Sequence, residues 1–286
     1  SYEIAFDNGS KFDISAIWVD TDRTEDERSF EYDDPTATSN SIVEGGNLET
    51  DNATVSYIDQ TNYNINSGYE LPLFGGTSKF KLGFARFEES VYEQEVEIDT
   101  SELPMVFEEE EETVDIDDKE WSLQWQHSLF AGENKTIQFG AFLQGKERDT
   151  AVYQAEGESE QNFASWDQFS KTPLSLAGFN NEFEAAAGGV NTLEEDRLDV
   201  FALVKHEDQD FSWEMGVRYE STDSNITDKT EGVTADNDYD FFLPSAHLRY
   251  NVSENGRISA SVARSLRRPD FDYITPALLE KELGDN

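Results

Sequence analysis

Four arginines towards the C-terminal end form the one basic concentration in an acidic sequence: Arg249, Arg264, Arg267 and Arg268. A guanidinium group donates paired hydrogen bonds to carboxylates and phosphates, so these side chains could meet an anionic ligand. They could instead pair with neighbouring acidic residues of their own chain, which is the interpretation that we favour. Among them, Arg264, Arg267 and Arg268 are the candidate ligand-binding residues.

Aromatic side chains form a second group of candidates, in a long connection that runs roughly from Glu147 to Glu194 and lacks the alternation of a strand. We single out Phe163, Trp166 and Phe169, because aromatic rings can stack on the face of a sugar or on a siderophore ring. The alternative, in which these rings pack the connection against itself, is equally well supported. Long connections of this kind are usually functional or disordered.

The sequence contains less evidence for metal binding or catalysis than for ligand binding. The run from Glu108 to Glu112 could attract a divalent cation such as Ca²⁺, but we favour a solvated charged loop. His127, His206 and His247 are far apart, and no cysteine is present, so no metal site is predicted. Neither a Gly-x-Ser-x-Gly elbow nor a phosphate-binding loop occurs. We therefore predict no catalytic residues and no cofactor, with loosely bound Ca²⁺ left open.

The composition limits the class of protein. With 21 Lys+Arg against 62 Asp+Glu, the formal charge of −41 excludes nucleic acid as a partner, because phosphates require a cationic surface. The 20 Phe, 11 Tyr and 5 Trp provide far more aromatic area than a disordered chain carries. No apolar run approaches eighteen residues, which argues against a membrane-spanning helix. Membrane-spanning strands remain open, because alternation hides half of their apolar content.

The elements that must position these residues are strands, because apolar and polar residues alternate with a period of two. In one arm Trp121, Leu123 and Trp125 alternate with glutamine and serine. We expect about ten such strands in five hairpins, with arms of roughly ten residues, which is enough to cross a bilayer. Short turns alternate with long polar segments such as 20–52 and 223–236. That pattern is typical of outer-membrane barrels, which have short periplasmic turns and long extracellular loops.

A family resemblance lies in the hairpin from Asp238 to Phe271, which contains LPSAHLRYNVSENGRISASVARSLRRPDF. It resembles a hairpin of TonB-dependent outer-membrane receptors, in which a strand opening with Leu-Pro-Ser carries an Arg-Tyr pair and the next strand ends in Arg-x-x-x-Arg-Pro-x-Phe. The matching residues are Leu243, Pro244, Ser245, Arg249, Tyr250, Arg264, Arg268, Pro269 and Phe271. Arg267 stands where a small residue is more usual. The preceding stretch FSWEMGVRYES, from Phe211 to Ser221, is similar to the Gly-Val-Arg-Tyr strand of the same family.

The resemblance implies an all-β fold, an antiparallel up-and-down transmembrane β-barrel. Residues 1–286 would be one partial barrel domain with long acidic extracellular loops, holding about ten of 22 strands. The plug and the C-terminal strands would be absent from it. The implied function is active uptake of a scarce nutrient, siderophore-bound iron or a carbohydrate, without enzymatic chemistry. The implied partners are the TonB complex, reached through the plug, outer-membrane lipid and a small nutrient. The implied location is the outer membrane of a Gram-negative bacterium.

Two other classes remain in view. A secreted acidic β-sandwich that binds carbohydrate or calcium would show the same alternation, with its apolar faces packed against each other. It would dissolve without detergent, whereas a barrel would not. An acidic glycosidase would instead turn over polysaccharides.

Overall fold

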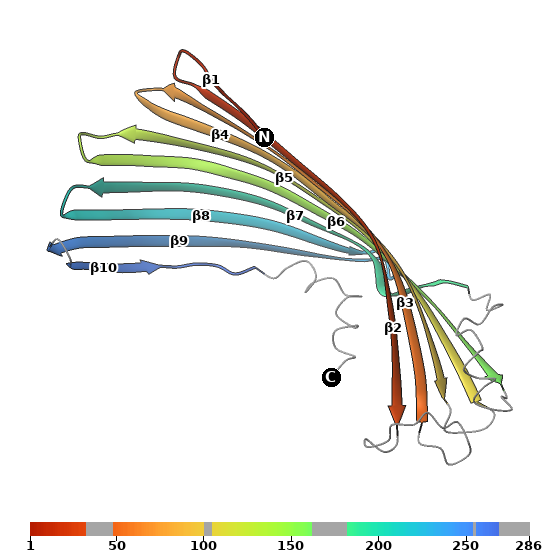
Figure 1. The fold of residues 1–286 in the computed structure, drawn as a ribbon. Helices are drawn as coiled ribbons and strands as arrows, with labels where there is room; N and C mark the ends of the chain where they lie inside the picture. Colours follow the sequence, from red (N-terminus) through yellow and green to blue (C-terminus); the bar gives the residue numbers. More distant parts are fainter. Residues whose placement is uncertain (33–47, 100–104, 162–181, 254–255, 269–286) are drawn as a thin grey trace.

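The computed structural model of the chain describes residues 1–32, 48–99, 105–161, 182–253 and 256–268. In these ranges the regular structure is one sheet of ten antiparallel strands, in which each strand pairs with the next along the chain (Figure 1). The strands are β1 (Tyr2–Ala5), β2 (Lys11–Tyr32), β3 (Leu48–Leu73), β4 (Gly76–Asp99), β5 (Met105–Phe130), β6 (Lys135–Gln161), β7 (Glu184–Glu207), β8 (Phe211–Asp228), β9 (Val233–Ser253) and β10 (Gly256–Ala263). The predicted fold class, all-β with ten antiparallel strands, is confirmed. The described residues contain no helix that is long and apolar enough to cross a membrane.

Most strands are far longer than the expected ten residues. The 26 residues of β3 extend over roughly 85 Å at about 3.3 Å per residue. Much of the polar segment 20–52 forms the ends of β2 and β3, and segment 223–236 forms parts of β8 and β9 around a turn at 229–232. The run from Glu108 to Glu112 lies within β5, so its expected place in a loop is wrong. The strands curve strongly along their length, and β2–β6 continue beyond the curve (Figure 1).

One face of the sheet carries an apolar band beside the short turns, and the register places its members next to one another. The members of the apolar band are Phe12, Ile14, Ala16 and Trp18 of β2, Tyr63, Ile65 and Tyr69 of β3, Phe80, Leu82 and Phe84 of β4, Trp121, Leu123 and Trp125 of β5, Ile137, Phe139, Ala141 and Leu143 of β6, Leu198, Val200, Ala202 and Val204 of β7, Trp213, Met215, Val217 and Tyr219 of β8, and Phe242, Pro244, Ala246, Leu248 and Tyr250 of β9.

In several strands, aromatic residues lie at both borders of the apolar band, with aliphatic residues between them. In β4 the order is Phe80, Leu82, Phe84, and in β5 it is Trp121, Leu123, Trp125. In β8 Trp213 and Tyr219 enclose Met215 and Val217. The six residue steps of strand from Trp213 to Tyr219 span roughly 20 Å, and the four residue steps between the aromatic borders in β4 and β5 span roughly 13 Å. Both lengths are below the height of about 25 Å that girdled lipid-facing bands have.

The apolar band is not covered by a second layer within the described ranges, where all ten strands belong to one sheet. Large side chains such as Leu82, Met215 and Phe242 are more than half exposed. The buried apolar residues lie instead towards the other ends of the strands, among them Val96, Ile98, Phe107 and Leu193. This distribution differs from that of a β-sandwich, which buries such a face against another sheet. It is the distribution of a sheet that faces lipid.

The turn between β3 and β4 differs by one residue from the expected Gly75-Gly76-Thr77. Phe74 and Gly75 form it, with φ angles of 50° and 74°, and Gly76 already belongs to β4. Two consecutive positive φ angles define the tight hairpin turn whose twist matches that of the strands. Phe74 is the one non-glycine residue with positive φ in the described part of the chain.

Candidate functional site

The face opposite the apolar band, which we call the polar wall, carries charged residues at the level of the band. Strand alternation places them there: Arg197 and Asp199 of β7 flank Leu198, which lies in the band. On β8, Arg218 and Glu220 flank Tyr219 in the same way. The candidate site is built from these alternate positions.

An arginine cluster, consisting of Arg197, Asp199, Arg218, Glu220 and Arg268, is formed by β7, β8 and the segment after β10. The Arg197 guanidinium donates to both carboxylate oxygens of Asp199, from Nε at 2.7 Å and from Nη2 at 2.6 Å. Its Nη2 also donates to Oε2 of Glu220 at 3.1 Å. Arg218 Nη1 reaches Asp199 Oδ2 at 3.3 Å. The side chains of Asp199 and Glu220 are 0% and 3% exposed, so both carboxylates depend on these arginines for charge compensation.

The segment that follows β10 brings two of the predicted arginines to this cluster. Arg268 forms an ion pair with Glu220. Arg264 donates from Nη1 to the carbonyl oxygen of Phe242 at 3.3 Å, and its guanidinium lies 5.8 Å from the ring centre of Phe241. Arg267 is exposed. Of the three candidate arginines, Arg268 thus lies against an acidic neighbour, and a ligand-binding role for the three remains a prediction.

A hollow of about 430 Å³ opens beside these side chains, lined by Arg197, Arg218, Glu220, Arg264 and Arg268. Its four arginines and one carboxylate, together with the neighbouring Asp199 and Glu195, give a local charge of 4 − 3 = +1 in a chain of −41. Ion pairs can exchange partners, so an incoming carboxylate or phosphate can replace Glu220 on an arginine. The arrangement suits reversible binding of an anionic group.

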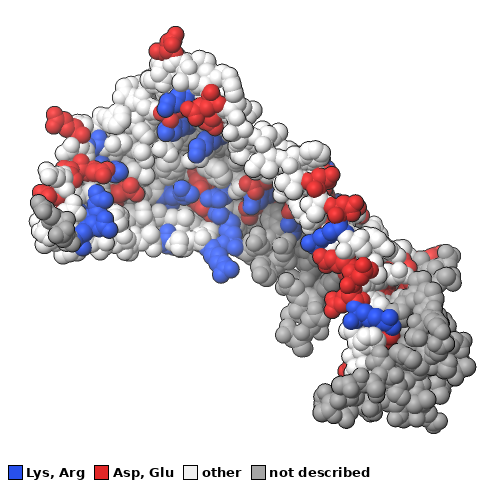
Figure 2. All heavy atoms as spheres, in the orientation of Figure 1, with Lys and Arg blue, Asp and Glu red and all other residues white. Residues whose placement is uncertain are grey.

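The polar wall continues onto β5 and β6. Arg148 donates from Nε to Asp118 Oδ1 at 2.6 Å, and Lys146 Nζ lies 3.5 Å from Glu120 Oε2. Arg268 lines a second hollow together with these residues. Figure 2 shows basic and acidic side chains next to each other on the visible face, as paired charges require. The wall thus presents paired charges across several strands.

The other sequence candidates that lie within the described residues do not join this site. Phe163, Trp166 and Phe169 lie outside the described residues. His127 is buried and bonds to Ser78, with 2.8 Å between Nδ1 and Oγ. Strand alternation places Glu109 and Glu111 on one face and the other three carboxylates of the 108–112 run on the other. Within the described ranges, no group of three or more His, Cys, Asp or Glu side chains is arranged to hold a metal ion.

Arg197 and Arg218 are members of the site that sequence reasoning did not list. Arg218 lies in the Gly-Val-Arg-Tyr stretch, whose alternation already placed it opposite Val217 and Tyr219. The face on which Arg197 lies could be predicted in the same way, because Arg197 directly precedes Leu198, the first of the alternating apolar residues Leu198 and Val200. What the sequence lacked was the register that brings Asp199, Arg218 and Glu220 together across β7 and β8.

Comparisons with known proteins support the class of fold. Residues 190–280, which include the arginine cluster, match the model of the outer membrane protein beta-barrel family. This match and the ten-stranded sheet confirm the predicted fold class and the predicted location, the outer membrane of a Gram-negative bacterium. No curated protein sequence matches the chain.

Several solved structures are similar in fold. They include the siderophore receptor PiuA from Acinetobacter baumannii, with 12% identity, a TM-score of 0.43 and coverage of 91% of this chain and 46% of that one. The ferric citrate transporter FecA in its unliganded form has 7% identity, a TM-score of 0.38 and coverage of 91% and 42%. The ferric-catecholate import receptor Fiu from E. coli K12, in its closed form, has 9% identity, a TM-score of 0.39 and coverage of 91% and 47%. The chain thus spans less than half the length of these structures.

Proposed function

We propose that this chain is a barrel segment of an outer-membrane receptor that takes up a scarce nutrient, with energy supplied through TonB. The observation that carries the proposal is the separation of the two faces. The apolar band suits lipid, and the polar wall behind it suits the interior of a barrel that contains water, a plug and a passing ligand. Such a receptor moves its ligand without covalent chemistry.

The arginine cluster favours an anionic ligand over a neutral one. Its hollow is locally positive, and the guanidinium of Arg218 is half exposed and therefore available. A siderophore–iron complex that carries carboxylates or catecholates meets this requirement better than a neutral oligosaccharide. Ferric citrate, the ligand in the name of the similar FecA, is an anionic chelate of this kind.

The test is an uptake assay in the native host with the full-length protein. We expect deletion of the gene to abolish uptake of one labelled ferric chelate at limiting iron, and a proton uncoupler to abolish it in the intact strain. The Arg218→Gln variant should reduce that uptake several-fold, since it removes one charge-assisted partner of the anion. Arg23→Gln is the matched control, because the two arginine side chains are 49% and 50% exposed and Arg23 lies outside the cluster.

Two outcomes would contradict the proposal. Uptake that survives the uncoupler would indicate passive diffusion, as through a porin. If deletion of the gene abolished uptake of an oligosaccharide instead of a ferric chelate, the protein would still be a receptor, but the proposal of an anionic ligand would be wrong.

A further inference from the structure

The chain leaves the sheet directly after β10, where the hydrogen-bond ladder with β9 loses one partner. Continuing the β9–β10 register by one residue brings Arg264 opposite Pro244, and the Arg264 N–H donates to the Pro244 carbonyl at 3.0 Å. Proline has no N–H, so it cannot return the second hydrogen bond of this pair. The strand ends at Ala263, and residues 264–268 continue as an irregular segment (Figure 1).

The edge of β9 is open beyond this point. Within the described residues, the part of β9 from Val233 to Leu243 pairs only with β8, so one row of its backbone groups has no strand partner. Arg264 takes the place of the missing ladder at one position, where its Nη1 donates to the Phe242 carbonyl at 3.3 Å. An open edge of this kind can accept a further strand.

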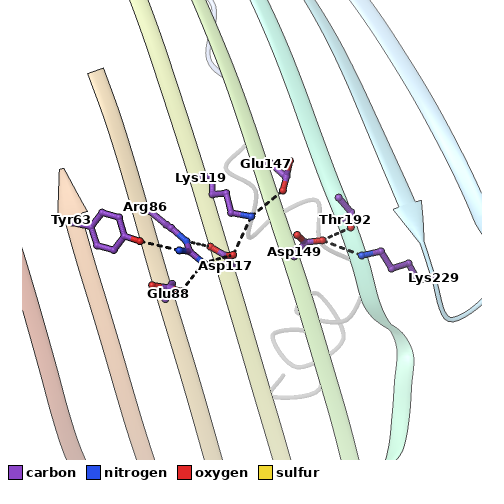
Figure 3. A network of polar contacts seen from close by, with 9 residues as sticks. All are labelled: Tyr63, Arg86, Glu88, Asp117, Lys119, Glu147, Asp149, Thr192 and Lys229. Atoms are coloured by element: carbon purple, nitrogen blue, oxygen red, sulfur yellow. Dashed lines mark hydrogen bonds and ion pairs between the residues drawn. The ribbon is translucent and has the colours of Figure 1, made fainter. Parts of the chain in front are cut away.

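The irregular segment lies instead on the polar wall, where Arg268 forms an ion pair with Glu220. The Nε of Arg268 is buried there and has no hydrogen-bond acceptor among the described residues. Arg86 in Figure 3 is a suitable comparison, because its side chain is 29% exposed and that of Arg268 is 25% exposed. Arg86 donates from both Nε and Nη2 to Asp117, at 2.7 and 2.9 Å. Arg268 thus lacks an acceptor of the kind that Arg86 has.

The charges around Arg268 favour an added anion. Four arginines, Arg268 among them, line the hollow of the arginine cluster, against the three carboxylates of Glu195, Asp199 and Glu220. A carboxylate bound in the hollow neutralises the remaining positive charge and can accept the hydrogen bond of Arg268 Nε. An anion therefore stabilises the position of the segment on the polar wall, whereas a neutral ligand leaves the charge of the cluster unchanged.

The open edge of β9 offers the segment a second position. The same register brings Leu266 opposite Phe242 and Arg268 opposite Asp240. In that position Leu266 extends the apolar band beside Phe242, and Arg268 can form a cross-strand ion pair with Asp240, whose side chain is exposed. The segment loses the contact with Glu220 and gains ladder hydrogen bonds, so each position has its own set of stabilising interactions.

We propose that residues 264–268 form a strap that closes on an anionic ligand at the arginine cluster, with Arg268 as a ligand-binding residue, and that opens by pairing with the edge of β9. In the closed position the ligand accepts a hydrogen bond from Arg268 Nε. In the open position Arg268 pairs with Asp240 and the hollow is accessible. The inference rests on the anionic ligand of the proposed function and adds how that ligand is held and released.

Disulfide trapping tests the strap, because the chain has no cysteine of its own. The Leu266→Cys/Phe242→Cys pair reports the open position, since residues that exchange hydrogen bonds in an antiparallel ladder have Cα atoms about 5.5 Å apart, within disulfide range. The matched control is Ala260→Cys/Leu248→Cys, a pair of the same kind in the same ladder and on the same face. The full-length protein is oxidised in detergent alone, with citrate as an anionic probe, and with maltose as a neutral one.

We expect the open-position disulfide to form without citrate and to form several-fold more slowly with it, whereas maltose has no effect and the control pair responds to neither probe. Arg218→Gln should abolish the effect of citrate, because it removes one partner of the anion. Glu220→Gln should accelerate the open-position disulfide in the absence of citrate, because it removes the ion pair that holds the closed position.

The strap is wrong if the open-position disulfide fails to form while the control pair does, if it forms equally fast with and without citrate, or if citrate accelerates it. If circular dichroism shows that the first cysteine pair disrupts the sheet, Ser265→Cys/Leu243→Cys reports the same position. The uptake assay separates this inference from the proposed function. A strap that responds to citrate in a protein that takes up no ferric chelate contradicts the uptake alone, whereas chelate uptake that depends on Arg218, with a disulfide insensitive to citrate, contradicts the strap alone.

Discussion

Three glutamates face one another across neighbouring strands in the part of the sheet that lies beyond Arg86 and Lys119, away from the apolar band. Glu110 of β5 is paired in register with Glu95 of β4 on one side and with Glu156 of β6 on the other. Adjacent strands are about 4.8 Å apart, so the three carboxylates crowd one another. Burial, followed by the charges of Glu95 and Glu156, raises the pKa of Glu110 above its ordinary value. The folded sheet therefore holds a proton on this residue more tightly than the unfolded chain does.

The raised pKa of Glu110 determines whether its contribution to the stability of the sheet grows or shrinks as pH rises. A carboxyl group whose pKa is raised by folding stabilises the sheet when protonated, below its unfolded pKa of about 4.3, and loses that contribution as pH rises through the folded pKa. We expect Glu110→Gln to increase the free energy of unfolding at pH 7 by about 0.5 kcal/mol, by removing like-charge pairs. The gain should shrink towards zero near pH 3.5, where Glu110 is protonated. Urea unfolding in detergent at both pH values measures it.

The control for this prediction is Glu133→Gln, which changes an exposed residue in the turn between β5 and β6. It should leave the free energy of unfolding unchanged at both pH values. An equal gain from both variants would mean that the overall charge of −41, and not the local row of carboxylates, governs stability.

Individual residues of the candidate site were only partly predictable. Arg264 and Arg268 were identified from the sequence because cations are rare in this chain. The acidic partners could not be identified in the same way, since any of 62 carboxylates was a candidate. Asp199 and Glu220 are 21 residues apart in sequence, and only the β7–β8 register, which pairs them directly, brings them together. Register depends on every pair along two strands, which a local pattern does not specify.

At the scale of elements, the turn between β3 and β4 contains a residue in an unfavourable conformation. Phe74 has a φ of 50° and is 84% exposed, so little packing compensates the clash of its Cβ atom. Asparagine adopts positive φ more readily, and Asn-Gly is the preferred pair for such turns. We expect Phe74→Asn to stabilise the sheet by about 0.5–1 kcal/mol, measured as a higher urea midpoint with an unchanged m-value.

Phe130→Asn is the matched control for the turn, because Phe130 is also an exposed aromatic residue next to a short turn but has no positive φ. If both variants raise the urea midpoint equally, the gain comes from removing an exposed aromatic ring and not from the turn. A lower midpoint for Phe74→Asn alone would show that the contact of Phe74 with His127 outweighs the backbone effect.

The number of strands, and the face of the sheet on which their apolar residues lie, could be predicted from the sequence. The length of the strands could not. Alternation in β4 and β5 places Phe80 and Trp125 on the apolar face, as their register confirms. Beyond Arg86 and Lys119 the apolar residues, such as Val96, Ile98 and Phe107, stand among many charged residues, so the hydrophobic alternation becomes weak in the sequence even though the strands continue. Ion pairs and hydrogen bonds such as Arg28–Asp51 and Ser56–Glu93 hold those parts. A hydrophobic pattern does not detect strands that are stabilised by polar pairs.

At the scale of the whole molecule, the apolar band and its aromatic borders imply a defined depth in the membrane. Trp18, Trp121, Trp125 and Trp213 all belong to the band, and Trp166 is the fifth tryptophan of the chain. In β5 the two tryptophans border Leu123 on either side, and Trp213 lies near the short turn after β7. Such residues prefer the level of the lipid interface to the middle of the hydrocarbon.

Tryptophan fluorescence tests this depth. In lipid vesicles, the Trp166→Phe variant reports only the four tryptophans of the band. We expect lipids brominated near the headgroup to quench it more strongly than lipids brominated near the chain ends, and water-soluble acrylamide to quench it weakly. Strong quenching by acrylamide with none by brominated lipid, together with a monodisperse chain in detergent-free buffer, would mean that the apolar faces pack against each other. The outer-membrane assignment of this face would then be wrong, because tryptophans at a lipid interface are accessible to brominated lipid and are shielded from a quencher in the water phase.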